Sequence, residues 1–260
     1  IMQTIHLYDL LEIQKIREPG IQIVSNLSFL PVNENNLVYK AARLLQEEFA
    51  LTDGISVKLT KRIPVAAGMA GGSTDAAAML YAMNQLYDLG LSRRELMKRG
   101  VQIGADVPYC LMRGTALAEG IGEKLTQLPP MIKCPVLIAK PSISVSTRFV
   151  YQNLKLDEQT NHPDIDALMK DIREKDFDGV CAHMGNVLES VTIPNYPVIA
   201  EIKQQMMRSG AKASMMSGSG PTVFGLFEDG ETAKRALREM KRSGLAKQVY
   251  LTTIYNNRRK

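Results

Sequence analysis

The chain has 260 residues, of which 45% are hydrophobic and 23% charged, with a formal net charge of +5 and a mean hydropathy of −0.11. These values are typical of soluble globular proteins and favour two domains, and the positive balance suits acidic small-molecule ligands. No apolar run reaches the roughly 20 residues that span a bilayer, and the basic residues form no stripe with aromatic ones, so neither a membrane nor a nucleic acid is expected as a partner.

The cysteines and histidines indicate neither a disulfide framework nor a zinc site. Three cysteines lie far apart with no CxxC spacing, namely Cys110, Cys134 and Cys181. No H-E-x-x-H pattern links the histidines His6, His162 and His183. We therefore expect reduced core cysteines, structural or surface histidines and, since no signal peptide precedes the fold, a cytoplasmic location.

The first 60 residues are predicted to form strands around one helix. Strand patterns cover the opening residues 1–7 and the stretches 10–13 and 21–24. Helical spacing follows over 36–49. Alternation of apolar and polar residues at 55–60 then predicts a strand with one buried face.

A glycine-rich segment, PVAAGMAGGST (64–74), separates this strand from a predicted amphipathic helix at 76–87. Its glycines permit backbone angles and close approaches that a Cβ atom blocks. The N–H groups of such a loop join the unpaired donors and the positive dipole end of the following helix, which favours an anion such as phosphate. Ser73 and Thr74 add hydroxyl donors, and Asp75 is a candidate helix cap.

Two common nucleotide motifs do not match this segment. It lacks the Gly-Lys-Ser/Thr ending of the P-loop, and its glycine spacing is not that of the dinucleotide motif G-x-G-x-x-G. From the residues alone, a glycine turn shaped for packing is as good an interpretation as a phosphate loop.

The next candidate for chemistry is Asp106, in the segment GADVPYC. Before it, Ser92 and Glu95 form a capping box that opens a short helix, which Gly100 is expected to close. Asp106 is either a functional acid or the N-cap of a helix that has Pro108 in its first turn. A strand is predicted at 115–118.

Pro129-Pro130 marks the predicted boundary between an N-terminal domain, 1–130, and a C-terminal domain, 131–260. The second domain is predicted to be a small α+β sandwich that begins with a buried strand at 135–139. Its other predicted elements are helices at 163–174, 177–191, 197–208 and 231–242, a glycine loop at 216–221, and strands at 222–227 and 248–253.

PVAAGMAGGSTDAAA (64–78) and MSGSGPTVFGLF (216–227) resemble, in order, the phosphate motif and the C-terminal glycine motif of the GHMP kinases. This family of small-molecule kinases includes galactokinase, homoserine kinase and mevalonate kinase. Between the two motifs, GADVPYC and GTALAEGIGEKL resemble one branch, the kinases of 4-diphosphocytidyl-2-C-methyl-D-erythritol. The resemblance extends over nearly the whole chain.

This resemblance implies an α+β, two-domain GHMP kinase fold. The N-terminal domain would be like ribosomal protein S5 domain 2 and the C-terminal domain ferredoxin-like. The implied activity is ATP-dependent transfer of the γ-phosphoryl group to a hydroxyl of 4-diphosphocytidyl-2-C-methyl-D-erythritol, in the non-mevalonate isoprenoid precursor pathway. Magnesium would accompany the ATP.

The resemblance also implies roles for particular residues. Asp106 would be the carboxylate beside the substrate hydroxyl, Tyr151 would pack on the cytosine ring, and Thr147 would lie near it. The residues implied in ATP binding are Pro64, Val65, Ala66, Ala67, Gly68, Met69, Ala70, Gly71, Gly72, Ser73, Thr74, Asn36, Lys61, Ser217, Gly218 and Ser219. A helix-capping Asn36, a solvated Lys61 and an ordinary interface Tyr151 remain alternative interpretations, and no magnesium ligand is assigned.

In this family, a lysine on the first strand is the cation that partners the aspartate. The printed sequence begins at Ile1 and holds no matching strand or lysine. We therefore expect residues upstream and predict that the 260-residue form binds nucleotide but turns over poorly. The alternatives are a GHMP kinase for another small alcohol, such as homoserine or mevalonate, and a catalytically impaired nucleotide-binding relative.

Overall fold

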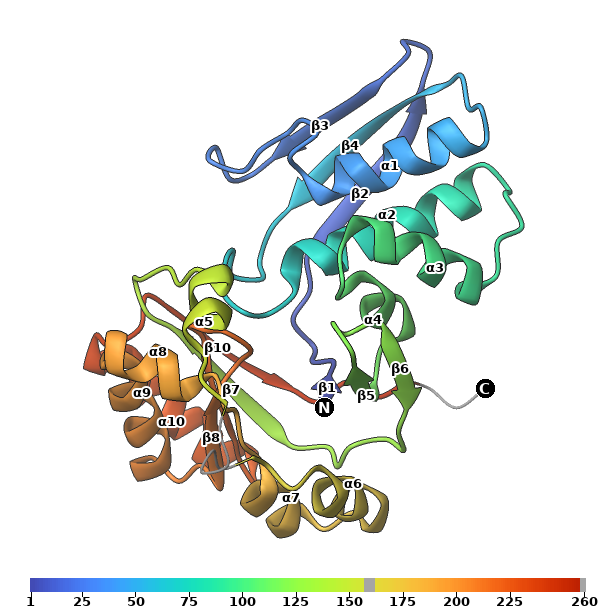
Figure 1. Cartoon of the computed structure of the whole chain (residues 1–260). Coiled ribbons are helices and arrows are strands. Elements are labelled where there is room, and N and C mark those ends of the chain that lie inside the picture. The colour runs from blue at the N-terminus through green and yellow to red at the C-terminus, as the bar shows by residue number, and fades with distance from the viewer. Residues whose placement is uncertain (157–161, 258–260) are drawn as a thin grey trace.

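The protein is described by a computed structural model that covers residues 1–156 and 162–257 (Figure 1). Its first half contains the strands β1 (Met2–Gln3), β2 (Leu10–Ile16), β3 (Ile21–Ser25), β4 (Gly54–Thr60), β5 (Thr115–Glu119) and β6 (Lys124–Gln127). The helices of this half are α1 (Leu37–Glu48), α2 (Gly71–Leu86), α3 (Arg93–Ile103) and α4 (Val107–Met112).

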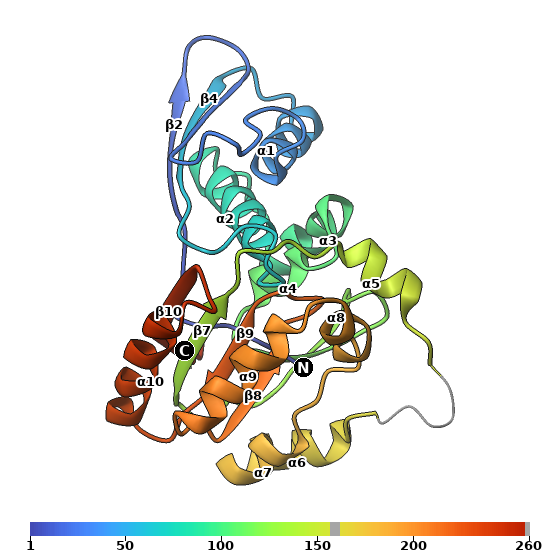
Figure 2. The same cartoon turned by 90° about the vertical axis from the view of Figure 1, so that its left-hand side faces the viewer.

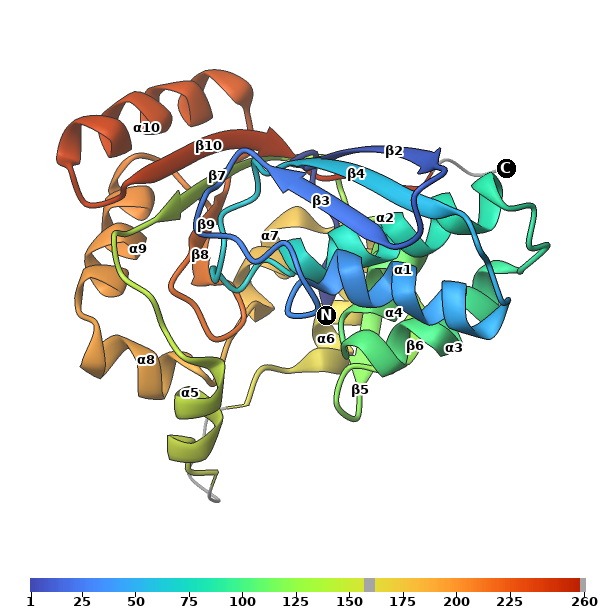
Figure 3. The same ribbon diagram turned by 90° about the horizontal axis from the view of Figure 1, so that it is seen from above.

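One sheet of this half has the order β2-β4-β3, with β2 antiparallel and β3 parallel to the central β4. The alternation predicted for β4 is confirmed, because Ile55, Val57 and Leu59 are all buried. Helices α1 and α2 cover this face of the sheet, as Figure 3 shows from above. A second sheet, β1-β5-β6, lies near the C-terminal half.

The second half is built on one antiparallel sheet in the order β10-β7-β9-β8 (Figure 2). Its strands are β7 (Pro135–Lys140), β8 (Ala213–Met216), β9 (Val223–Leu226) and β10 (Gln248–Thr253). Its helices are α5 (Thr147–Asn153), α6 (Ile165–Glu174), α7 (Phe177–His183), α8 (Glu189–Asn195), α9 (Val198–Arg208) and α10 (Gly230–Ser243). In sequence order the strands lie 4-1-3-2, which confirms the predicted ferredoxin-like arrangement.

Residues of β7 alternate between two cores. Leu137 and Ala139 belong to the cluster that α9 and α10 cover, while Val136 and Ile138 belong to a cluster with α6 and α7 on the opposite face. Met69, from the glycine-rich loop of the first half, packs against the second cluster. The loop is therefore anchored on the C-terminal sheet. None of the helices in the described part of the chain is long and apolar enough to cross a lipid bilayer.

Several predicted boundaries were wrong for identifiable reasons. Helix α3 passes through Gly100, because this glycine gives α4 room: a Cβ there would lie 2.9 Å from Val107 Cγ1. The predicted helix 177–191 is two helices separated by 184–188. The opening strand is limited to Met2–Gln3, and Ile5 instead forms a single bridge with Ile254.

Sequence reasoning also missed three short elements, β6, β8 and α5. Strand β8 has four residues and α5 has seven, and both are too short for periodicity to be recognised. Because β8 was missed, the second glycine loop was not recognised as the turn of the β8–β9 hairpin.

Candidate active site

The glycine-rich segment between β4 and α2, which we call the phosphate loop (residues 64–74), ends at an uncapped helix. Three of its residues, Ala66, Gly68 and Ala70, have positive φ angles of 50°, 69° and 51°. Ala70 occupies the N-cap position of α2 and has no side chain that can cap it. The first N–H groups of α2 therefore have no intrahelical acceptor and no side-chain cap, which leaves them available to an anion.

The side chains of the first turn of α2 leave this end open. The Thr74 hydroxyl turns back and donates to Ala70 O at 2.9 Å. Asp75, predicted as a possible cap, points instead into the protein interior, where its side chain is 4% exposed. The capping hypothesis for Asp75 was wrong because α2 begins earlier, at Gly71, than the apolar periodicity indicated.

A second loop, which we call the hairpin loop (residues 217–222, between β8 and β9), touches the phosphate loop. The Ser217 hydroxyl donates to Gly68 O at 2.7 Å. Gly68 fits closely here, since a Cβ atom on it would lie 2.2 Å from Ser217 O. The two segments of the GHMP resemblance, far apart in sequence, thus lie side by side. The buried Ser219 hydroxyl shares a 2.8 Å hydrogen bond with the hydroxyl of Thr147, at the start of α5.

Two residues that sequence reasoning missed hold the hairpin loop from behind. The Asn186 amide donates to Met216 O at 2.9 Å and to Gly218 O at 2.8 Å, and Glu189 accepts from Met216 N at 2.7 Å. Glu189 also pairs with Lys203 of α9. An N-x-x-E spacing, common at helix starts, was the available signal, but it was hidden inside the predicted helix 177–191.

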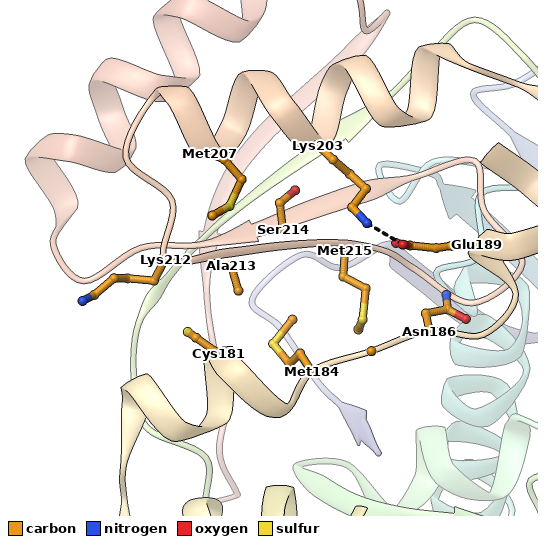
Figure 4. Close-up of a pocket in the computed structure, with 11 residues that line it drawn as sticks. Cys181, Met184, Asn186, Glu189, Lys203, Met207, Lys212, Ala213, Ser214 and Met215 are labelled. Carbon is orange, nitrogen blue, oxygen red and sulfur yellow. Dashed lines mark hydrogen bonds and ion pairs between the residues drawn. The ribbon is translucent and has the colours of Figure 1, made fainter. Parts of the chain in front are cut away.

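Figure 4 shows these residues on the wall of a pocket of about 290 Å³, which opens beside the edge strand β8 and not into the phosphate loop. Asn186 and the Glu189–Lys203 pair lie at one end, and the side chains of Cys181, Met184 and Met215 line the floor. The residues that line the pocket belong neither to the phosphate loop nor to the hairpin loop.

Asp106 immediately precedes α4, but its side chain does not cap this helix, which was the structural alternative to a functional acid. Its side chain makes no capping hydrogen bond, and its backbone is in the right-handed helical region. Burial raises the pKa of its carboxyl group. The Thr74 hydroxyl lies 3.4 Å from Cys110 Sγ, one turn after Asp106, and this contact ties α4 to the first turn of α2. The acid is therefore held on a short helix next to the phosphate loop.

The comparisons with known proteins agree with this geometry. The family model "GHMP kinases N terminal domain" matches residues 36–114, and "GHMP kinases C terminal" matches 168–246. The 4-diphosphocytidyl-2-C-methyl-D-erythritol kinase of Lachnospira eligens is 56% identical over 98% of this chain and 88% of its own length. The protein of the same name from Lachnoclostridium phytofermentans is 53% identical over 99% of this chain and 89% of its own length.

The chain belongs to the GHMP kinase family. Within that family, its similar curated relatives are the 4-diphosphocytidyl-2-C-methyl-D-erythritol kinases. A crystal structure of 4-(cytidine 5'-diphospho)-2C-methyl-D-erythritol kinase superposes with a TM-score of 0.82 at 28% identity, covering 97% of this chain and 88% of that one. Homoserine kinase from Cytophaga hutchinsonii superposes with a TM-score of 0.80 at 22% identity, over 95% of this chain and 86% of that one, which shows a shared fold.

In this GHMP kinase the side chains of Asn36 and Lys61 are already engaged inside the protein. Asn36 caps α1, accepting from Val38 N at 2.9 Å, and donates to Pro31 O. The Lys61 side chain is 3% exposed and its ammonium pairs with two carboxylates, so the alternative of a solvated charge was wrong. The contacts of Asn36 and Lys61 with ATP remain predictions. Contacts made through the backbone atoms of these residues would leave the side-chain interactions intact.

The two residues assigned to the cytidine side both lie on α5. Tyr151 is 61% exposed, which leaves its ring free to stack on a ligand. Thr147 is exposed but bonded to Ser219, so α5 is joined to the hairpin loop. The same helix thus carries the predicted nucleobase contact and a connection to the second glycine loop.

Proposed function

We propose that this protein transfers the γ-phosphoryl group of MgATP to a hydroxyl of 4-diphosphocytidyl-2-C-methyl-D-erythritol. The substrate assignment is supported by relatives of that name at 45–56% identity. The observation that carries the reaction type is the uncapped N-terminus of α2 beside Asp106, a carboxylate with no capping bond. Together they offer an anion site and a proton acceptor on neighbouring helices.

Asp106 acts on the acceptor hydroxyl by orientation and by late proton transfer. An ordinary carboxylate is too weak a base to ionise an alcohol in advance, but phosphoryl transfer has a loose transition state, so the proton leaves as the new bond forms. The raised pKa of Asp106 makes it a better proton acceptor at that stage. The N–H groups of the phosphate loop stabilise the phosphate oxygens as the bridging bond breaks.

Magnesium enters this scheme with the nucleotide. Among the described residues, no three His, Cys, Asp or Glu side chains gather as a metal cage. Mg²⁺ commonly keeps several waters and binds substrate phosphates, which fits a loop rich in backbone donors and poor in carboxylates. It supplies charge neutralisation for the phosphate oxygens, and the backbone amides share that task.

The test is product formation with three competing alcohols in one mixture. Incubation with MgATP, 4-diphosphocytidyl-2-C-methyl-D-erythritol, homoserine and mevalonate should give one phosphorylated product, from the cytidine substrate, detected by phosphorus NMR even when turnover is slow. A phosphorylated homoserine or mevalonate, in place of that product, would overturn the substrate assignment.

Substitution of Asp106 separates a kinase from an inert nucleotide-binding relative. Asp106→Asn should lower turnover by about 100-fold or more while leaving the affinity for a non-hydrolysable ATP analogue within about twofold. Asp88→Asn, an exposed position at the far end of α2, is the matched control and should leave both unchanged. Unaltered turnover in Asp106→Asn would show that this carboxylate is not the acceptor.

We also propose that residues 1–130 and 131–260 are the two domains, in a cytoplasmic protein that acts on small molecules. The buried cluster built on β4, α1 and α2 lies entirely within the first range, and the cluster under α9 and α10 lies entirely within the second. Limited proteolysis followed by mass spectrometry tests the boundary, with the first cut expected near Pro129-Pro130.

A further inference from the structure

A buried cluster of three charges lies directly under the phosphate loop. Lys61, just after β4, places its ammonium between the carboxylates of Asp9 and Asp75, with 2.7 Å from Nζ to Asp75 Oδ2. The three side chains are 3%, 1% and 4% exposed. Asp9 precedes β2 and lies 52 residues before Lys61, so the cluster joins the N-terminal segment to the two sides of the phosphate loop.

The cluster is attached to the phosphate loop at both ends. Oδ1 of Asp9 accepts hydrogen bonds from the backbone N–H groups of Arg62 and Ile63, which lead into the loop. At the other end, a Cβ atom on Gly71 would lie 3.3 Å from Lys61 Nζ. The ammonium thus lies behind the first residue of α2, and Asp75 lies one turn further along the same helix.

The cluster holds one cation and two acids, and Asp75 is the acid with fewer partners. Its Oδ1 is buried without a hydrogen-bond partner among the described residues. Burial raises the pKa of Asp75, Lys61 opposes this rise, and the neighbouring Asp9 adds to it, giving a value of about 7. Asp75 therefore exchanges a proton near neutral pH.

Lys61 and Asp9 are the charged groups that shift the pKa of Asp75. From α4 it faces Cys110, whose pKa burial raises to about 12, so the thiol stays neutral. Arg113 and Asp106 act on that thiol from the two ends of α4. Helices α1 and α3 contribute apolar side chains to the core around α2. Ionisation of Asp75 therefore adds one negative charge to the cluster that it forms with Asp9 and Lys61.

We propose that nucleotide binding at the phosphate loop is coupled to proton uptake by Asp75, a positioning residue that never touches the ligand. The proposal rests on the proposed function. Asp75 is the fifth residue of α2, so its carboxylate lies roughly 8 Å from an anion at the helix N-terminus, given a rise of about 1.5 Å per residue. The negative phosphates oppose ionisation of Asp75, and a proton from the buffer, bound to its carboxylate, removes that repulsion.

Linkage makes the effect reciprocal, so the affinity for nucleotide should fall as pH rises through about 7. Isothermal titration calorimetry of the wild-type protein with MgADP, in buffers of different ionisation enthalpy, measures the protons taken up directly. Asp75→Asn keeps the shape of the side chain and a partner for Lys61, and it serves as the reference. Its proton uptake measures the protons that the ligand itself exchanges and is subtracted from that of the wild type. We expect the wild type to take up a few tenths of a proton more than Asp75→Asn at pH 7.5.

The affinity ratio gives an independent readout. At pH 8.5 Asp75→Asn should bind MgADP about fivefold more tightly than the wild type, and at pH 6 the two should agree, because the asparagine resembles the protonated acid. Asp88→Asn removes the same charge at the other end of α2, roughly 20 Å away, and should follow the wild type at both pH values.

The outcomes separate the two proposals. A surplus of protons in the wild type, with a pH-dependent ratio, supports the coupling. Equal proton uptake and a constant ratio would overturn it and leave the kinase assignment intact. Binding of MgADP to neither protein would overturn the proposed function and the coupling together. Thermal unfolding of both variants shows that the comparison is between folded proteins.

Discussion

The phosphate loop and the hairpin loop have similar glycine-rich sequences but are built in different ways. The phosphate loop leads into a helix of 16 residues and lies over buried charges. The hairpin loop joins two four-residue strands and is held largely by neutral hydrogen bonds, from Asn186, Ser217 and Ser219. Of the two, the phosphate loop combines unpaired N–H groups with the positive end of a helix dipole, whereas the hairpin loop packs against it and supports it.

Glycine therefore has two uses at this site. In the phosphate loop, glycine and a run of small residues expose backbone donors to a ligand. At Gly68, in the same loop, glycine lets the backbone approach that of Ser217 in the hairpin loop. Sequence motifs rich in glycine do not distinguish these uses, but substitutions do.

The largest effect is expected where the loops touch. Gly68→Ala combines a positive φ of 69° with a Cβ atom 2.2 Å from Ser217 O, so one backbone has to move. We expect a loss of about 4 kcal/mol in the free energy of unfolding, measured by urea denaturation, together with weaker nucleotide binding.

The control for this change is Gly244→Ala. Gly244 has almost the same φ, 71°, but a Cβ atom there meets nothing within 4 Å. It should cost about 1 kcal/mol, the strain of the backbone angle alone. Equal losses in the two variants would show that the close approach of the loops contributes nothing.

The second effect concerns the buried charges under the phosphate loop and is seen in the pH dependence of the free energy of unfolding. The pKa of Asp75 is about 7 in the folded protein against an ordinary 3.8, so the folded state keeps a proton that the unfolded state releases. This contribution to stability is complete below about pH 3.8 and is lost as pH rises through about 7. Between pH 5 and 8 the wild type should lose about 2 kcal/mol more than Asp75→Asn. Parallel stability curves for the two proteins would contradict it.

An effect of similar size is expected behind the hairpin loop. Asn186→Ala removes the amide that donates to Met216 O and Gly218 O, both from one side chain. Chemical denaturation should show a loss of about 2 kcal/mol. Asn195→Ala, which loses a single bond to Val191 O within its own helix, is the matched control and should lose about half as much. The reverse order would indicate that the hairpin loop needs no support from Asn186.

The smallest effect is expected from the single hydrogen bond that joins the hairpin loop to the phosphate loop. Ser217→Ala removes the 2.7 Å bond to Gly68 O and should cost about 1 kcal/mol. Ser190→Ala removes a bond of the same length, to Val187 O, at an exposed site and should cost less. The affinity for MgADP, measured by calorimetry, should fall for Ser217→Ala alone if this bond orders the phosphate loop.

Much of the fold could be predicted from local patterns. The strand β4 and the helix α1 each have a clear period, because one face of each is buried, and Asn36 caps the start of α1. The boundaries that failed depend on distant contacts. Gly100 resembles a helix end in the sequence, yet it lies inside α3 because Val107 of α4 packs against it.

The site was partly predictable for the same reason. The phosphate loop and Asp106 are continuous segments, so the residues themselves indicated them. Asn186 and Glu189 were missed because their partners, Met216 and Gly218, lie some 30 residues away. The buried position of Lys61 depends on Asp9, 52 residues earlier, and no spacing rule connects the two.

The Asp9 carboxylate sets an order of assembly. Strand β4, the phosphate loop and α2 are contiguous and form contacts over short stretches of chain, but the clamp at Arg62 and Ile63 has to wait until the N-terminal segment closes a loop of more than 50 residues. The Ser217 bond closes one of 149 residues. From these loop lengths we expect the nucleotide cradle to be completed late in folding, so that ligand binding during refolding would report formation of the whole fold and not of its local elements.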